Sequence, residues 1–268
     1  MAEAVDQASF SSMTDPASPG KRVTACLLII GNEILSGRTQ DANLAYIAKG
    51  LNEVGIQLRE ARVIPDVPET IIGTVNETRV LFDYVFTTGG IGPTHDDITA
   101  ACVAQAFGVD LVLDPEAKRR LEAHYPGGIV NEARMHMAHV PQGAILIDNP
   151  VSAAPGFQIG NVLVLPGVPR IMQAMFDGVR HRLAGGVVIL SRTVSCNLAE
   201  SMVAAGLSAI QDRYPDLEIG SYPFFRAGKF GTSLVLRGPD EARLESAAEA
   251  VRGLIRAHGG EPHGEEPA

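Results

Sequence analysis

The stretch TTGGIGPTHDDIT, residues 87–99, directly follows the apolar run at residues 84–86. Glycine and proline end a buried strand at this point, and the apolar positions from Ile98 to Phe107 predict a helix that Gly108 can close. A strand, a glycine-rich turn and a helix in succession are the building unit of an α/β sheet. The stretch therefore predicts the fold class and the edge of the sheet at which a ligand would bind.

The same unit repeats before this stretch. Val23–Ile30 is an almost continuous apolar run, which is typical of a parallel strand buried on both faces. A helix follows, with Asp41 able to cap its start and Gly55 suited to its end, and residues 56–64 form the next strand. Another helix begins after Asp66. This alternation predicts a doubly wound α/β domain with three layers, helix, sheet and helix.

The domain organisation follows from changes in pattern along the chain. Residues 22–184 fit the α/β plan, although the segment 115–141 is less regular and is interpreted as an insertion or lid. Residues 185–257 show the order strand, helix, strand, strand, helix, which predicts a small α+β domain. The two ends, 1–21 and 258–268, are expected to be disordered tails. Two further short strands are expected in the first domain, at 144–147 and 162–165.

The composition narrows the class of protein. The chain has 268 residues, 46% of them hydrophobic, and a formal net charge of −9. No apolar run is long enough for a membrane helix, and the first twenty residues lack the features of a signal peptide, so a cytoplasmic protein is expected. The acidic balance argues against a nucleic-acid partner. The three cysteines, Cys26, Cys102 and Cys196, are expected to be buried reduced thiols.

The glycine-rich loop has the features of a phosphate cradle. Glycines 89, 90 and 92 are expected to take positive φ and to bring the backbone close to a ligand. Pro93 fixes the exit of the loop, Thr88 and Thr94 offer hydroxyl groups, and the following helix start favours an anion. The loop is neither a Walker loop nor a dinucleotide fingerprint.

The adjacent carboxylates Asp96 and Asp97 complicate a phosphate site, since they would repel a bare phosphate. Two interpretations remain open. A divalent cation could lie between the carboxylates and the phosphate, or one aspartate could cap the helix while the other positions metal or water.

Three other polar or glycine-containing loops are expected at strand ends. The first, residues 30–43, carries Glu33, Asp41 and Asn43. The others are the turn at 152–158 and the loop at 165–172. Because the carboxyl ends of parallel strands gather at one edge of a sheet, these loops predict one shared site. The further candidates for ligand contact in it are Gly156, Pro166 and Gly167.

Other candidate residues have two interpretations each. His95 is either a general base or a loop histidine. His136 and His139 could share a helix face as a metal pair, or simply pack or face solvent. Arg134 and Arg170 either bind phosphate or lie on the surface.

These motifs resemble a known family. Four stretches are similar to the amino-terminal part of the CinA (competence/damage-inducible protein) family, within the MoaB/Mog molybdopterin-binding superfamily. They are GNEILSGRTQDAN at 31–43, TTGGIGPTHDDIT at 87–99, APGF at 154–157 and LPGVP at 165–169. The likeness covers about residues 22–257, because GSYPFF at 220–225 is similar to the small second domain of CinA proteins.

The resemblance implies a MoaB/Mog-like domain that binds a small phosphorylated nucleotide or pterin, such as molybdopterin, in a homo-oligomer. It also implies a hydrolase of ADP-ribose-type or FAD-type pyrophosphates that uses a divalent ion, magnesium or cobalt, and potassium. By motif, Gly89, Gly90, Gly92, Pro93 and Thr94 would hold phosphate. Asp96 and Asp97 would bind a metal ion or position a water molecule. The remaining polar groups around the ligand would be Glu33, Asp41 and Asn43.

Two departures qualify the expected function. Ile171 stands where the family commonly has glutamate, and the chain ends without the deamidase domain of longer CinA proteins, so no nicotinamide mononucleotide deamidase activity is expected. The favoured function is a metal-dependent nucleotide pyrophosphohydrolase. The alternative is a non-hydrolytic molybdopterin-binding module or a Mog-like adenylyl or molybdopterin transferase, because the same loop serves both.

Overall fold

The computed structural model describes residues 22–125, 129–226 and 228–264. The predicted amino-terminal tail, the Pro-Gly-Gly at 126–128 and the last four residues lie outside this part of the chain. The described residues form two compact units that divide between Val187 and Val188. Each unit has its own buried core and is described by itself.

The first unit is built on a six-stranded sheet in the order β2-β1-β3-β8-β7-β6. The first four strands in this order run parallel, and β7 and β6 are antiparallel additions at one edge. The strand order reverses between β1 and β3, the place where open α/β sheets bind their ligands. The strands are β1 (Val23–Ile30), β2 (Ile56–Ile64), β3 (Tyr84–Thr88), β6 (Ile145–Ile147), β7 (Gly156–Ile159) and β8 (Val162–Leu165).

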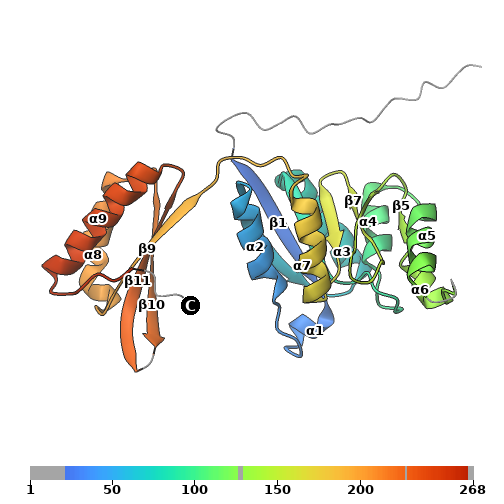
Figure 1. Cartoon of the computed structure of the whole chain (residues 1–268), viewed down its shortest axis with the longest axis horizontal. Coiled ribbons are helices and arrows are strands. Elements are labelled where there is room, and N and C mark those ends of the chain that lie inside the picture. Colours follow the sequence, from blue (N-terminus) through green and yellow to red (C-terminus); the bar gives the residue numbers. More distant parts are fainter. Residues whose placement is uncertain (1–21, 126–128, 227, 265–268) are drawn as a thin grey trace, which may run out of the picture. The chain divides into compact units, whose positions relative to one another are not determined.

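Helices cover both faces of this sheet (Figure 1). The pair α2 (Asn43–Glu53) and α7 (Pro169–Arg180) packs on one face. The pair α3 (Pro68–Leu81) and α4 (Thr99–Phe107) packs on the other. The predicted three-layer α/β/α class is therefore confirmed.

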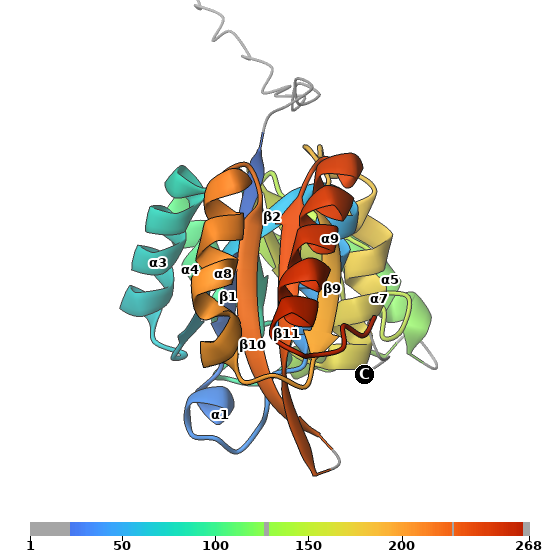
Figure 2. The same cartoon turned by 90° about the vertical axis from the view of Figure 1, so that its left-hand side faces the viewer.

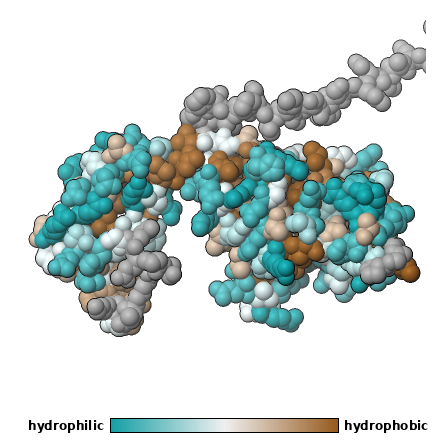
Figure 3. Space-filling view, in the orientation of Figure 1, coloured by the Kyte–Doolittle hydropathy of each residue, from teal (hydrophilic) through white to brown (hydrophobic). Residues whose placement is uncertain are grey.

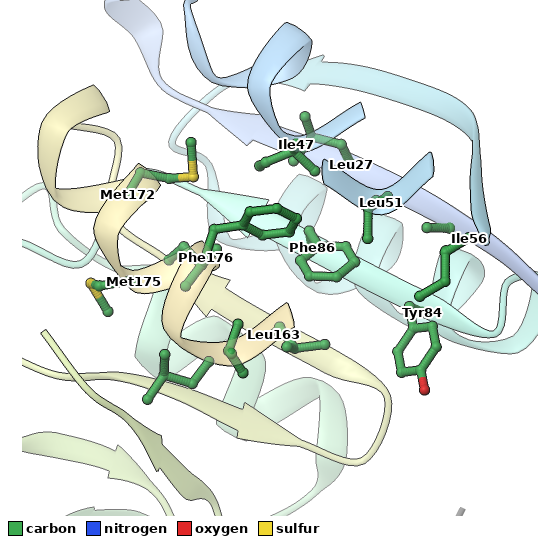
Figure 4. Packing of buried hydrophobic residues seen from close by; sticks show 14 of the residues in the cluster. Leu27, Ile47, Leu51, Ile56, Tyr84, Phe86, Leu163, Met172, Met175 and Phe176 are labelled. Atoms are coloured by element: carbon green, nitrogen blue, oxygen red, sulfur yellow. The ribbon is translucent and has the colours of Figure 1, made fainter. Parts of the chain in front are cut away.

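Alternating residues of the central strands supply the two core layers. Phe86 of β3 lies at the centre of the layer under α2 and α7, where its ring meets Phe176 edge-on at 5.9 Å between centroids (Figure 4). Its neighbour Val85 belongs to the opposite layer. Both layers are apolar, as expected for parallel strands buried on both faces.

The segment predicted as an insertion or lid has regular structure. Asp114 accepts hydrogen bonds from the backbone N–H groups of Glu116 and Ala117, at 2.9 and 2.8 Å, and so caps the helix that follows it. A two-stranded antiparallel sheet, which the pattern did not predict, joins the ends of this segment. The elements are β4 (Leu111–Leu113), α5 (Pro115–His124), α6 (Glu132–His136) and β5 (His139–Pro141).

The turn predicted at 152–158 is only partly correct. Its second half is strand β7, which pairs antiparallel with both β6 and β8. Proline and glycine suggested a turn, but the backbone from Gly156 onward is extended and its hydrogen-bonding groups are used inside the sheet.

The second unit has the predicted order strand, helix, strand, strand, helix. Its sheet has the order β10-β11-β9, and α8 and α9 lie side by side over one face (Figure 2). This small α+β region is therefore also confirmed. The elements are β9 (Leu190–Cys196), α8 (Glu200–Arg213), β10 (Glu218–Arg226), β11 (Lys229–Gly238) and α9 (Glu241–Ala257).

The prediction of disorder after residue 257 is wrong for residues 258–264. The backbone N–H of His263 donates to the Ser195 carbonyl at 2.7 Å, and the Ser195 N–H donates to the His263 carbonyl at 3.0 Å. The segment thus adds one bridge to the outer edge of β9.

Much of the surface visible in Figure 3 is hydrophilic. Within the described ranges, every helix is too short or too polar to span a bilayer.

Candidate functional site

Three loops meet at the carboxyl ends of β1, β3 and β8. The Gly89 N–H donates to the Leu165 carbonyl at 3.1 Å, which joins the end of β3 to the end of β8. A Cβ on Gly89 would lie 2.1 Å from the Ile30 carbonyl oxygen, and a Cβ on Gly167 would lie 3.4 Å from the Gly89 Cα. The three strand ends are therefore in direct contact, as the shared-site prediction requires.

The glycines of the central loop have different roles. Gly89 and Gly90 have φ of 102° and 65°, which confirms the predicted left-handed backbone. A Cβ on Gly90 would also lie only 2.2 Å from the Thr99 hydroxyl oxygen. The prediction is wrong for Gly92, which is outside the left-handed region; a Cβ there would meet the Asp97 carboxylate at 2.7 Å.

The loop is tied to the helix that follows it. Thr99 donates from its backbone N–H to the Gly90 carbonyl at 2.9 Å, and from its hydroxyl to the Gly89 carbonyl at 3.1 Å. These bonds hold the glycine backbone in place without using any ligand.

The two aspartates differ in their partners. Asp97 Oδ2 accepts from the Thr94 N–H at 2.8 Å and from the Thr94 hydroxyl at 2.5 Å, so this carboxylate closes the loop. The alternative that an aspartate caps α4 is wrong, because Ile98 is the N-cap and no side chain caps this helix. Asp96 is exposed, and the nearby Thr94 hydroxyl and then the backbone N–H lower the pKa of its carboxyl, which is therefore ionised at neutral pH, although the one hydroxyl hydrogen of Thr94 is donated to Asp97 in this conformation.

Three buried polar atoms near these strand ends have no hydrogen-bond partner in the described structure: Asn43 Oδ1, Thr87 Oγ1 and Thr88 Oγ1. The amide nitrogen of Asn43 donates to the Gly167 carbonyl at 2.8 Å, which fixes which way the amide faces. Thr88 lies opposite Ile29 in the sheet, on the face that α2 covers, whereas Thr87 is on the other face. Unpaired buried polar groups are rare and costly, so a ligand that satisfies Asn43 Oδ1 and Thr88 Oγ1 is the simplest explanation for these two atoms.

The first loop contains a short helix, α1 (Asn32–Leu35), that carries Glu33 at its exposed surface. Asp66 Oδ2 accepts from the Asn32 N–H at 2.8 Å and so holds this loop against the end of β2. Asp41 Oδ1 accepts from the Leu44 N–H at 2.8 Å, as expected for a residue that stabilises the start of α2. Asp66 was predicted only as a helix-start residue, although its place just after a strand end could have indicated a role at this edge.

The carboxylates do not form a ready metal site. Among the described residues, no three histidine, cysteine, aspartate or glutamate side chains lie close enough together to hold a metal ion. Burial raises the pKa of the Cys26 and Cys102 thiols to about 11, so neither is a thiolate ligand at neutral pH. Metal binding by Asp96 and Asp97 therefore stays a prediction.

Two residues that were candidates for ligand contact, Gly156 and Arg134, have contacts with the protein itself. Gly156 is buried within β7, and a Cβ on it would lie 2.3 Å from the Val164 carbonyl oxygen, so close strand packing explains this glycine. The Arg134 guanidinium lies over the Tyr125 ring, 4.1 Å from its centroid. His95 and Pro93 are exposed on the central loop, Arg170 is exposed in the first turn of α7, and the roles of all three stay predictions.

His136 and His139 do not share a helix, because α6 ends at His136 and β5 begins at His139. Their rings nevertheless lie near each other, with 6.1 Å between centroids. Both line a pocket that also includes Gly92 and Asp97 of the central loop. The shared helix face is therefore wrong, and the metal-pair interpretation stays a prediction.

Comparison with known proteins agrees with this architecture. Residues 26–184 match the family described as "Probable molybdopterin binding domain". The chain belongs to this molybdopterin-binding domain family. Residues 188–260, in the second unit, match the family described as "FAD synthase, middle domain".

Two named relatives match most of this chain. A "CinA-like protein" of Desulfosudis oleivorans is 34% identical over 72% of this chain and 50% of its own length. A "Probable FAD synthase" of Caenorhabditis elegans is 30% identical over 89% of this chain and 51% of its own length. The chain thus spans about half the length of these two relatives.

A solved structure supports the fold assignment. CinA from Thermoplasma acidophilum, whose function is described as unknown, is 34% identical, with a TM-score of 0.57 over 60% of this chain and 98% of that one. Together with the family match, this confirms the resemblance to CinA proteins within the molybdopterin-binding domain superfamily.

Proposed function

We propose that the loops after β1, β3 and β8 bind the phosphate groups of a small nucleotide or pterin, and that the chain hydrolyses the pyrophosphate of an ADP-ribose-type or FAD-type nucleotide. The observation that carries the binding site is the pair of unpartnered buried polar atoms Asn43 Oδ1 of α2 and Thr88 Oγ1, which lies on the face of the sheet that α2 covers; Thr87 faces the other layer and is not counted. The two atoms adjoin backbone that glycine alone can form, at the reversal of strand order.

The names of the relatives support this substrate class. Both families that the chain matches are named after ligands with phosphate groups, molybdopterin in the first unit and FAD in the second. FAD contains a pyrophosphate, so it is a reasonable first substrate to test. The homo-oligomer implied by the resemblance belongs to the same proposal, and light scattering in solution would test it.

The orientation of Asn43 restricts the ligand. Because the side-chain nitrogen of Asn43 donates to the Gly167 carbonyl, the buried atom left without a partner is its carbonyl oxygen, and that atom can only accept. The ligand must place a hydroxyl or N–H group there rather than a phosphate oxygen. A ribose hydroxyl and a pterin N–H both meet this requirement.

We assign the role of orienting the attacking water to Asp96. It is exposed and ionised, and its lowered pKa makes it a weak base, so its role is to orient the attacking water by a hydrogen bond. The backbone N–H groups of the glycine loop would stabilise charge on the leaving phosphate. Asp97 keeps the loop in shape through Thr94.

The carboxylates near the cradle would take a divalent ion only as part of the substrate. The described carboxylates do not gather into a metal site, and Asp97 is already bonded to Thr94. Magnesium commonly arrives on the phosphates and keeps most of its waters. We therefore derive no catalytic step from a resident metal.

The alternative is a binding module or transferase that does not hydrolyse its ligand. The family description names binding alone, and the bond between Asp97 and Thr94 leaves one free carboxylate where two were expected. The same cradle would then hold molybdopterin or an adenylylated pterin.

The test is turnover of FAD and ADP-ribose, with and without magnesium, cobalt or potassium, followed by release of AMP. Wild type should release AMP, and Asp96→Asn should lower kcat by roughly tenfold or more while KM changes little. Asp212→Asn, an exposed aspartate of α8, is the matched control and should keep full activity. If the folded wild type binds these nucleotides or molybdopterin but releases no AMP, the proposed hydrolysis is wrong. The binding module or transferase would then be the better description of the function.

A further inference from the structure

A pocket opens on the side of the central loop that faces α6 and β5. Its lining is mainly apolar, with Ala100 and Ala101 of α4 and Phe157 of β7 among the lining residues. The two imidazoles His136 and His139 and the carboxylate of Asp97 are its ionisable groups. The proposed phosphate-binding site does not account for two imidazole groups close together in this pocket.

The hydrogen bonding of His139 fixes its proton. Its Nδ1 lies 3.2 Å from the Met135 carbonyl oxygen, and a carbonyl can only accept, so Nδ1 carries the hydrogen. In the neutral ring, Nε2 then keeps its lone pair. A backbone carbonyl that holds one ring nitrogen in this way is the usual arrangement behind a metal-binding histidine.

His136 lies close to His139 but farther than two rings on one ion would be. Their ring centroids are 6.1 Å apart and the ring planes differ by 35°. Imidazole nitrogens bind zinc at about 2.0–2.1 Å in tetrahedral geometry, so the centres of two rings on one ion lie about 5 Å apart. A shared ion therefore requires the exposed His136 side chain to move about 1 Å closer to His139.

The charge of the pocket favours a cation over an anion. Asp97 places a carboxylate in the lining, and the described lining residues include no lysine or arginine. Asp97 is not close enough to complete a group of three ligands with the histidines. An ion held here would have two imidazole ligands, one fewer than open zinc sites commonly have, and would fill its remaining positions with water.

The geometry points to a site for a single divalent transition-metal ion, held by His136 and His139 beside the phosphate-binding loop. Imidazole nitrogen suits zinc, cobalt, nickel and copper, whereas magnesium prefers oxygen, so the site should discriminate against magnesium. This inference does not depend on the proposed hydrolysis, because it concerns a metal that binds without nucleotide.

The test is a titration of the full chain, free of any histidine tag, with Co²⁺ and with Zn²⁺. Cobalt absorption in the visible range reports nitrogen ligation, and calorimetry gives the stoichiometry and Kd for zinc. The wild type should bind one ion, and a large excess of Mg²⁺ should not displace it. His136→Ala and His139→Ala should each weaken binding by roughly tenfold or more.

His181→Ala provides the matched control, because His181 is exposed at the end of α7 and lies outside the pocket lining. It should bind the metal like the wild type. Circular dichroism of each variant checks that it is folded. The inference is overturned if the wild type binds no Co²⁺ or Zn²⁺, if the two folded pocket variants bind as tightly as the wild type, or if magnesium competes at equal concentration.

Discussion

Gly89 shows how a single position constrains the cradle. Its φ is 102°, and a Cβ there would lie 2.1 Å from the Ile30 carbonyl oxygen. Gly89→Ala would therefore strain the backbone and push the ends of β1 and β3 apart. We expect the free energy of unfolding, measured in urea, to fall by at least about 2 kcal/mol, and nucleotide binding to be lost.

Gly73 offers the matched control for that substitution. It lies in α3, is exposed, and has open space around the position of a Cβ. Because alanine favours the helix more than glycine does, Gly73→Ala should raise the free energy of unfolding by about 0.5–1 kcal/mol. A Gly89→Ala protein as stable as Gly73→Ala would contradict the close contact of the strand ends.

The Thr88 hydroxyl should matter for the ligand and not for the fold. It is buried without a protein partner, so Thr88→Val removes an unsatisfied group and should leave the ligand-free protein as stable as the wild type, or more stable by up to about 1 kcal/mol. Loss of a hydrogen bond to the ligand should raise the Kd for nucleotide by roughly fivefold to tenfold. Thermal unfolding with and without nucleotide measures both effects.

Thr78→Val is the control for Thr88→Val. The Thr78 hydroxyl is also buried, but it donates to the Thr74 carbonyl at 2.8 Å within α3. This substitution should cost about 1 kcal/mol of stability and leave nucleotide affinity unchanged. If both variants change stability and nucleotide affinity in the same way, the Thr88 hydroxyl does not bind the ligand.

At the scale of elements, the sequence predicts the helices and strands that are long and have a periodic pattern of apolar residues. The strands 23–30 and 56–64 have the predicted bounds. The first is an apolar run buried on both faces, which indicates a strand clearly. The second is only partly buried, but it lies between the glycine that ends α2 and Pro65, which mark its bounds. The three-residue strands β4 and β5 offer too few residues for a pattern. Strand β7 was not predicted from the sequence, because Pro155 and Gly156 at its start are residues typical of turns.

The site was predictable in outline for the same reason. Strand ends and glycine loops can be read along the chain, so Gly89, Gly90, Asn43 and Gly167 were found together. The bond between Asp97 and Thr94 depends on the loop conformation, and the approach of His136 to His139 depends on how α6 meets β5. Neither follows from spacing along the sequence.

Helix α5 depends on its cap. Asp114 satisfies two N–H groups at the start of α5, whose residues Ala117 and Leu121 bury a small core with Ala138. Asp114→Ala should lower the free energy of unfolding by about 1 kcal/mol. Asp110→Ala, at an exposed side chain that caps no helix, should change it by less than about 0.5 kcal/mol. Equal effects in denaturant titrations would argue against the cap.

At the scale of the whole molecule, the site and the metal pocket belong to the first unit. Every residue assigned to either lies before Val188, where the second unit begins. We expect a chain that ends at residue 187 to fold and to bind nucleotide with the affinity of the full chain, as measured by calorimetry. A fragment that is folded but binds at least tenfold more weakly would show that the second unit contributes to the ligand site.

The mutual contact of the three strand-end loops also bears on the rate at which a ligand enters. Gly89 is fixed to the ends of β1 and β8 by backbone contacts that exist before any ligand arrives. A cradle already assembled has no slow rearrangement to complete. Association should therefore be a single step, with an observed rate that rises in proportion to nucleotide concentration and does not level off.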